Sequence, residues 1–145
     1  MKQSLVAIAF GAFLTPALAQ MTPVGTWNSI DDKTQEPKAE IRIAEGPNGL
    51  SGRIEKTLRK GAKTVCDECT DDRKGQPMVG LEIIRGGKKN ADKDVWEGGT
   101  ILDPENGKEY RASFTPVDGG RQLQVRGYLG PFWRTQTWQR VQQPN

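Results

Sequence analysis

Hydrophobic and polar residues alternate over short stretches of this chain, and turn segments rich in Gly and Pro separate the stretches. Alternation with a period of two is typical of strands that bury one face. No segment after residue 19 shows helical periodicity. The pattern predicts eight strands: Val24–Ser29, Ala39–Glu45, Leu50–Leu58, Met78–Arg85, Val95–Ile101, Glu109–Thr115, Leu123–Tyr128 and Phe132–Val141.

Tight turns join most of these strands, so the sequence fits either a closed barrel or a sandwich. A barrel is favoured because a meander of hairpins needs no long crossover and because closure removes both exposed edges. The last strand supports this choice. It places Arg134, Gln136, Trp138 and Arg140 on one face and threonines on the other, so neither face is purely apolar. We therefore predict an all-β, eight-stranded antiparallel up-and-down barrel over residues 20–145, with some polar groups inside.

The first nineteen residues have the pattern of a signal peptide. Lys2 supplies a positive charge, Leu5–Leu14 is apolar but too short to span a bilayer, and Ala17–Ala19 is a small-x-small cleavage motif. We expect cleavage after Ala19 and a mature protein without a membrane-spanning segment, located in the periplasm or secreted.

The charge distribution argues against a nucleic-acid partner. The formal net charge is +3, and the lysines and arginines are interspersed with acids along the chain. A nucleic-acid surface needs basic residues that cluster. The densest basic stretch, Lys56–Lys60 with Lys63, is interpreted as a solvated loop.

Two cysteines, Cys66 and Cys69, lie in the longest predicted connection, Arg59–Pro77. In an oxidising compartment a structural disulfide is the leading interpretation. Two alternatives stay open: a redox-active pair, which would need a helix N-terminus that the pattern does not predict, and half of a zinc site completed by carboxylates.

Residues suited to catalysis are scarce. The chain has no histidine, and no nucleotide-binding loop or nucleophile elbow is present. Candidate carboxylate pairs, such as Asp31–Asp32 and Asp103 with Glu105, fall in turn segments. The prediction is a protein that is not an enzyme and has no cofactor and no metal.

A short motif near the mature start resembles the Gly-x-Trp opening of lipocalins, here Gly25-Thr26-Trp27. In that superfamily a late arginine packs over the tryptophan, and the resemblance implies Arg134 for this role, with Arg140 in reserve. A longer resemblance, to the exported bacterial family catalogued as domain of unknown function 2147, covers nearly all of the mature chain. It is carried by Gly52–Ile54, Gln76–Leu81, Trp96–Tyr110, Val125–Gly130 and Arg134–Trp138. It implies a lipocalin-like barrel exported by a Gram-negative bacterium, without a known reaction or ligand.

The leading functional hypothesis is a barrel whose lumen binds a small, partly apolar or amphipathic molecule. The predicted contact residues are the aromatics and arginines of strands that enclose the lumen: Trp27, Trp96, Tyr110, Phe114, Arg126 and Arg134. Two alternatives remain. One is a structural or interaction protein with a filled barrel that presents the Arg59–Pro77 loop to an envelope partner. The other is a thiol or metal enzyme at Cys66 and Cys69.

Overall fold

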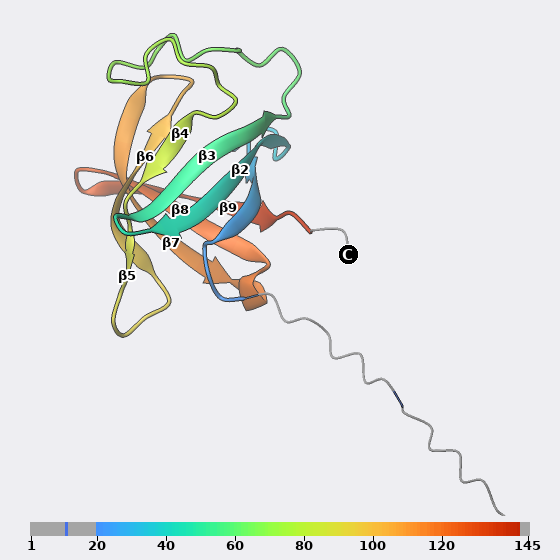
Figure 1. Cartoon of the computed structure of the whole chain (residues 1–145), viewed down its shortest axis with the longest axis vertical. Helices are drawn as coiled ribbons and strands as arrows, with labels where there is room; N and C mark the ends of the chain where they lie inside the picture. The colour runs from blue at the N-terminus through green and yellow to red at the C-terminus, as the bar shows by residue number, and fades with distance from the viewer. Residues whose placement is uncertain (1–10, 12–19, 143–145) are drawn as a thin grey trace, which may run out of the picture.

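The computed structural model describes residue 11 and residues 20–142, so nearly all of the predicted signal peptide lies outside the described residues. One antiparallel sheet and one short 3-10 helix, Asp118–Gly120, make up the regular structure of the described part (Figure 1). The strands are β1 Gly25–Ile30, β2 Pro37–Gly46, β3 Gly49–Thr57, β4 Glu82–Arg85, β5 Lys88–Lys89, β6 Trp96–Asp103, β7 Lys108–Val117, β8 Gln122–Leu129 and β9 Phe132–Arg140. No helix of these residues is long and apolar enough to cross a membrane.

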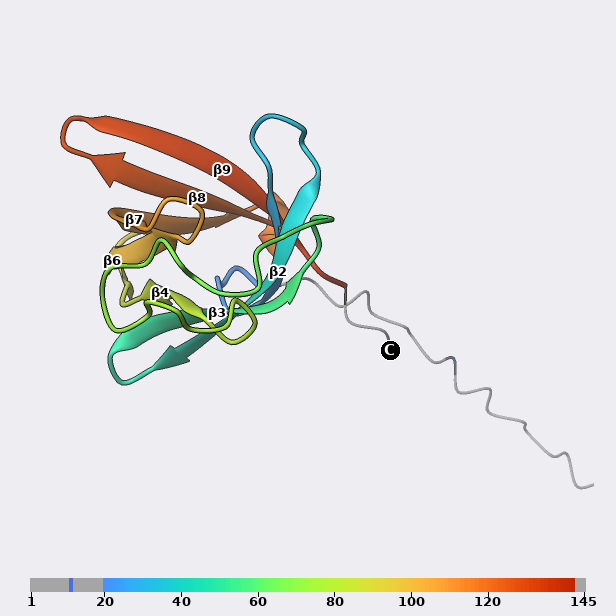
Figure 2. The ribbon, with the colours of Figure 1, turned by 90° about the horizontal axis from the view of Figure 1, so that it is seen from above.

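The sheet closes on itself. Its strand order is β4-β3-β2-β1-β9-β8-β7-β6-β5, and a further pairing of β4 with β6 joins the two sides. Apart from the two-residue β5, eight strands therefore form a closed barrel, which confirms the predicted all-β architecture (Figure 2). Two pairings join strands that are not sequence neighbours, β1 with β9 and β4 with β6.

Each predicted strand has a counterpart in the structure, and one of them is shorter than expected. Met78–Arg85 was predicted to form a strand throughout, but only its second half, β4, pairs as a strand. The chain departs from the ladder at Gly80, whose φ is +92°, a conformation that side chains rarely adopt. The backbone N–H of Gly80 still bonds to the carbonyl of Ile54, so the first half lies beside β3 without regular pairing.

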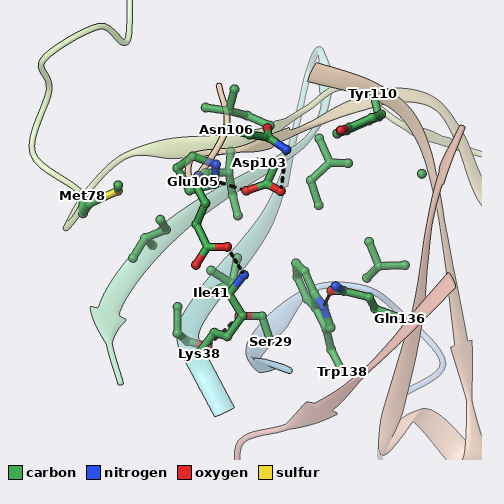
Figure 3. A pocket seen from close by; sticks show the side chains of 18 of the residues that line it. Ser29, Lys38, Ile41, Met78, Asp103, Glu105, Asn106, Tyr110, Gln136 and Trp138 are labelled. Carbon is green, nitrogen blue, oxygen red and sulfur yellow. Dashed lines mark hydrogen bonds and ion pairs between the residues drawn. The ribbon is translucent and has the colours of Figure 1, made fainter. Parts of the chain in front are cut away.

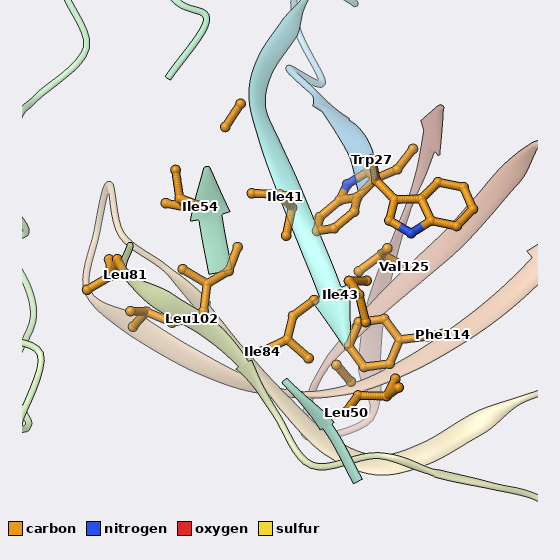
Figure 4. Close-up of a cluster of buried hydrophobic side chains, with 14 of the residues drawn as sticks. Trp27, Ile41, Ile43, Leu50, Ile54, Leu81, Ile84, Leu102, Phe114 and Val125 are labelled. Carbon is orange, nitrogen blue, oxygen red and sulfur yellow. The ribbon is translucent and has the colours of Figure 1, made fainter. Parts of the chain in front are cut away.

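One end of the barrel is filled by large side chains (Figure 4). Trp27 and Phe114 are fully buried there, and Leu50, Ile43 and Leu123 pack with them in the same cluster. The indole N–H of Trp27 donates to the carbonyl of Pro23 at 2.7 Å, so its one polar atom is satisfied. This packed end is called the floor below.

Inward-facing side chains become smaller away from the floor. On β1, Trp27 is followed by Ser29, and its neighbour on β2 changes from Ile41 to Ala39. On β8, the inward series runs from buried Leu123 and Val125 to Gly127. Small residues leave volume unfilled between strands held at fixed spacing. The barrel is therefore solid at the floor and hollow toward the other end, which is called the mouth.

The long connection between β3 and β4, residues 58–81, is fastened to the barrel wall. Arg73 is 1% exposed, donates to the carbonyl of Glu82 at 2.9 Å, and forms ion pairs with Asp71 and Glu109. The carbonyl of Glu68 approaches Gly107 so closely that a side chain there would collide with it. Although it has no regular strands, the connection is held by buried polar contacts.

Candidate functional site

The hollow half of the barrel contains a cavity of about 730 Å³ that opens at the mouth. Its deeper wall is mostly apolar. The apolar lining residues include Ala39, Ile41, Ile54, Met78, Ile83, Ile101, Val125 and Trp138. A volume in this range is typical of pockets for small organic molecules. Figure 3 shows Trp138 and Gln136 on one side of the cavity, facing Ile41 and Lys38 on the other.

The mouth of the cavity is ringed by charged side chains that pair with one another. Lys38 and Arg59 both bind Glu105, with N–O distances of 3.1 Å and 2.6 Å, and Arg59 also pairs with Asp31. The backbone N–H groups of the β1–β2 turn lower the pKa of Asp31, and Arg59 adds to this effect. Asp31 therefore stays ionised and holds the guanidinium of Arg59 at the rim.

A second polar connection runs from the mouth into the cavity. Gln136 donates through Nε2 to Asp32 at 3.0 Å and accepts a hydrogen bond from the indole N–H of Trp138 at 3.0 Å. Arg134 reaches the same carboxylate of Asp32 at 3.5 Å. These bonds satisfy the polar atoms that β9 directs inward, as the mixed pattern of this strand predicted.

Two of the six residues predicted to contact a ligand line the cavity. Tyr110 borders its wall, and Arg134 lies at the mouth with 80% of its side chain exposed. Trp27 and Phe114 are fully buried in the floor. The indole of Trp96 is buried away from the cavity lining and donates to Glu45. Whether any of the six binds a ligand remains a prediction.

Arg126 lies on the outer surface of the barrel. It follows Val125, which faces inward, so the alternation of β8 turns its side chain out. There it donates to Thr135 at 2.9 Å and stacks over the ring of Trp133, with 5.9 Å from the guanidinium carbon to the ring centre. The expectation that Arg126 faces the lumen is therefore wrong, because alternation along β8 places Arg126 on the face opposite Val125.

The arginine that packs over Trp27 is Arg140. The prediction of Arg134 for this role is therefore wrong, and the alternative, Arg140, is confirmed. The guanidinium carbon of Arg140 lies 4.1 Å from the centre of the Trp27 ring. Its nitrogens donate to the carbonyls of Gly120, Val24 and Thr22 at 2.6–2.8 Å. Burial lowers the pKa of Arg140, and these carbonyls supply the bonds that replace water.

Several residues that line the cavity are not among the predicted contact residues. Lys38, Met78 and Gln136 all line the cavity, as do the small residues Ala39 and Gly127. The predicted contact residues are aromatics and arginines, whereas the space in this barrel arises from small inward side chains. A useful signal was present in the sequence, because Ala39 and Gly127 occupy inward positions of strands whose other inward residues are large.

Cys66 and Cys69 form a disulfide with 5.5 Å between their Cα atoms, as the leading interpretation predicted. Both residues are buried in the β3–β4 connection. The ring spans only three residue steps, so it shapes the turn locally rather than linking distant parts of the fold.

Comparisons with known proteins agree with this geometry. The model of a family described as "Uncharacterized protein conserved in bacteria (DUF2147)" matches residues 25–140, from the first residue of β1 to the last of β9. Among solved structures, the chain is similar to one titled "Protein HP1028 from the human pathogen Helicobacter pylori belongs to the lipocalin family", with a TM-score of 0.70 and 14% identity. That match covers 86% of this chain and 84% of the other, so the barrel is lipocalin-like throughout. No curated protein matches the chain.

Proposed function

This chain belongs to the DUF2147 family of bacterial proteins, and we propose that it is a non-enzymatic binding protein that holds a small amphipathic molecule in the cavity of its lipocalin-like barrel. The observation that carries the proposal is the cavity of about 730 Å³, apolar in its depth and polar at its mouth.

The lining suggests how such a molecule lies. Its apolar part packs against Ile41, Ile54 and Val125, since burying apolar surface contributes about 25 cal/mol per Å². Its polar end lies near Tyr110 and Asn106, which border the cavity close to the mouth. A ligand turned the other way would bury a polar group without a partner, at a cost of about 1–3 kcal/mol.

The charges at the mouth favour a neutral polar end. Lys38 and Arg59 are paired with Glu105, and Arg134 is paired with Asp32. A charged ligand group would have to displace one of these partners and leave it unpaired. We therefore propose a ligand with an uncharged, hydrogen-bonding head, such as a hydroxyl or an amide.

Fluorescence titration with N-phenylnaphthylamine, a neutral apolar probe, tests the proposal. We expect saturable binding at one site and about tenfold weaker binding for Ala39→Leu, which fills part of the cavity. The matched control is Thr137→Leu, on the outer face of β9, which should bind the probe like the unmodified protein. Equal binding by all three proteins would place the probe outside the cavity and refute the proposal.

The proposal includes export. The Cys66–Cys69 disulfide supports it, since disulfides persist in oxidising compartments, and the pattern of residues 1–19 supports it independently. N-terminal sequencing of the protein from the cell envelope should begin at Gln20. A protein found in the cytoplasm that still begins at Met1 would contradict export. It would leave the proposal of ligand binding in the cavity untouched.

A further inference from the structure

The β8–β9 hairpin carries an unusual concentration of exposed apolar side chains. Leu129, Phe132 and Trp133 are 62%, 74% and 63% exposed, and no other large apolar side chain of the described residues is as exposed. They surround the turn at Gly130–Pro131, and in Figure 2 this turn projects past the ends of the neighbouring strands. Scattered exposed apolar residues are ordinary, but three around one projecting turn form a patch.

Directly behind this turn, the outer face of the barrel combines arginines with aromatic rings. Arg111 of β7, Tyr128 of β8 and Trp133 of β9 lie side by side in register. One step toward the floor, Arg126 pairs with Thr135 and lies over Trp133. Arg111 lies over Tyr128 in the same way, at 6.0 Å.

The two arginines lack acidic partners. Among residues 20–142, no carboxylate lies within 4.0 Å of the guanidinium of Arg111 or Arg126. The carboxylates nearby are otherwise engaged. Glu97, across a shallow outer groove, accepts a bond from Asn90, and Asp32 binds Arg134 and Gln136. The amide of Asn90 is neutral and leaves the charge of Glu97 in place, so the groove holds two arginine charges against one carboxylate and is positive on balance.

We infer that the β8–β9 hairpin docks on an anionic membrane surface, with Leu129, Phe132 and Trp133 in the interface and Arg111 and Arg126 against lipid phosphates. Trp and Tyr prefer the depth of the headgroups, and arginine keeps its charge in water while its stem lies along apolar surface. Basic residues add attraction to anionic lipids. Leu129 and Phe132 also border the cavity, so docking places the cavity mouth at the membrane.

Sedimentation with lipid vesicles tests the inference on the mature protein. The protein should sediment with vesicles of phosphatidylglycerol mixed with phosphatidylcholine, and its tryptophan emission should shift to the blue. Added salt should weaken both effects. The double variant Phe132→Ser with Trp133→Ser should bind about tenfold or more weakly. Each of Arg111→Gln and Arg126→Gln should weaken binding about fivefold, since a basic residue at such a surface contributes about 1 kcal/mol.

A control variant and a check of folding accompany the vesicle experiment. Val79→Ser removes a 59% exposed apolar side chain from the β3–β4 connection and should bind vesicles like the unmodified protein. Circular dichroism confirms that each variant is folded. The inference is overturned if the unmodified protein ignores anionic vesicles, if it binds phosphatidylcholine alone equally well, or if the hairpin variants only convert a dimer to a monomer. None of these outcomes affects probe binding in the cavity, so the proposed function is tested separately.

Discussion

The floor and the mouth of this barrel are built from the same strands but differ in what those strands place inside. At the floor, Trp27 and Phe114 fill the space and Arg140 seals it from below. At the mouth, Ser29 and Ala39 take the equivalent inward positions, and a cavity remains. The difference shows that one alternating pattern can specify both a solid core and a pocket. Side-chain size at the inward positions decides which of the two forms.

The polar groups at the two ends also differ. Arg140 at the floor makes its hydrogen bonds to backbone carbonyls, which are fixed in place by the fold. Arg59 and Arg134 at the mouth pair instead with side-chain carboxylates, those of Asp31, Glu105 and Asp32. Exposed pairs of this kind contribute little to stability. The floor should therefore contribute most of the stability, and the mouth should determine which ligands bind.

The largest expected effect comes from the two tryptophans that distinguish the ends. Trp27→Ala should lower the free energy of unfolding by about 3–5 kcal/mol, because it leaves a cavity in the packed floor. Trp133→Ala, on the exposed hairpin, should change it by no more than about 0.5 kcal/mol. Urea denaturation measures both. Similar losses for the two variants would show that the floor does not carry the stability.

The next effect separates the two arginines. Arg140→Met should cost about 2 kcal/mol, because it removes the bonds to buried carbonyls along with the contact to Trp27. Arg134→Met should stay within about 0.5 kcal/mol, because its side chain is exposed and its single ion pair is long. Thermal and urea unfolding give the two values. A larger loss for Arg134→Met than for Arg140→Met would show that the contacts of Arg140 at the floor do not carry this stability.

Filling the mouth should weaken binding and spare the fold. A Cβ built on Gly127 meets the nearest atom of Tyr110 at 3.6 Å, an ordinary contact, so Gly127→Val places its methyl groups in the cavity. We expect about tenfold weaker binding of N-phenylnaphthylamine, with the free energy of unfolding changed by less than about 1 kcal/mol. Unaltered binding would mean that the probe does not reach this part of the cavity.

The smallest effect concerns acid and the β3–β4 connection. Hydrogen bonds from Arg73 lower the pKa of Asp71 from its ordinary 3.8 to about 2. Because the folded-state pKa is the lower one, this contact stabilises the connection above about pH 4 and is lost as the pH falls through about 2. Pepsin cleavage within residues 58–81, measured relative to cleavage of an unstructured peptide at the same pH, should therefore rise over that range. Asp71→Asn should cleave faster at pH 4 already, and an unchanged rate would show that this ion pair does not hold the connection.

Much of the fold could be predicted because strand alternation and turn residues are local properties of the sequence. Leu123 and Val125 mark the inward face of β8, and the structure agrees. What alternation cannot supply is height along the barrel axis, since it separates inside from outside only. Trp27 and Phe114 were correctly expected to face inward, but they lie in the floor rather than beside the cavity. The level of each residue follows from where the hairpins turn and where bulges interrupt the pairing, as between Trp96 and Gly99.

The error with Arg134 has a similar physical origin. Hairpins fix the register of neighbouring strands through the turn that joins them. β1 and β9 are joined by no turn, so nothing local in the sequence sets Trp27 opposite Arg140 rather than opposite Arg134. The register of β1 against β9 also depends on every hairpin between them. It could be predicted only if the position of each β-bulge were known from the sequence.

The pairing of β1 with β9 also bears on how the polypeptide reaches its native state. Only two residue pairs join these strands, Trp27 with Arg140 and Asn28 with Gln139, and they lie at opposite ends of the chain. Contacts between such distant segments form slowly, because a long loop must close first. The barrel therefore cannot seal until its last strand has been synthesised. A chain truncated before β9 would keep two unpaired strand edges, the kind of surface on which partly folded β proteins aggregate.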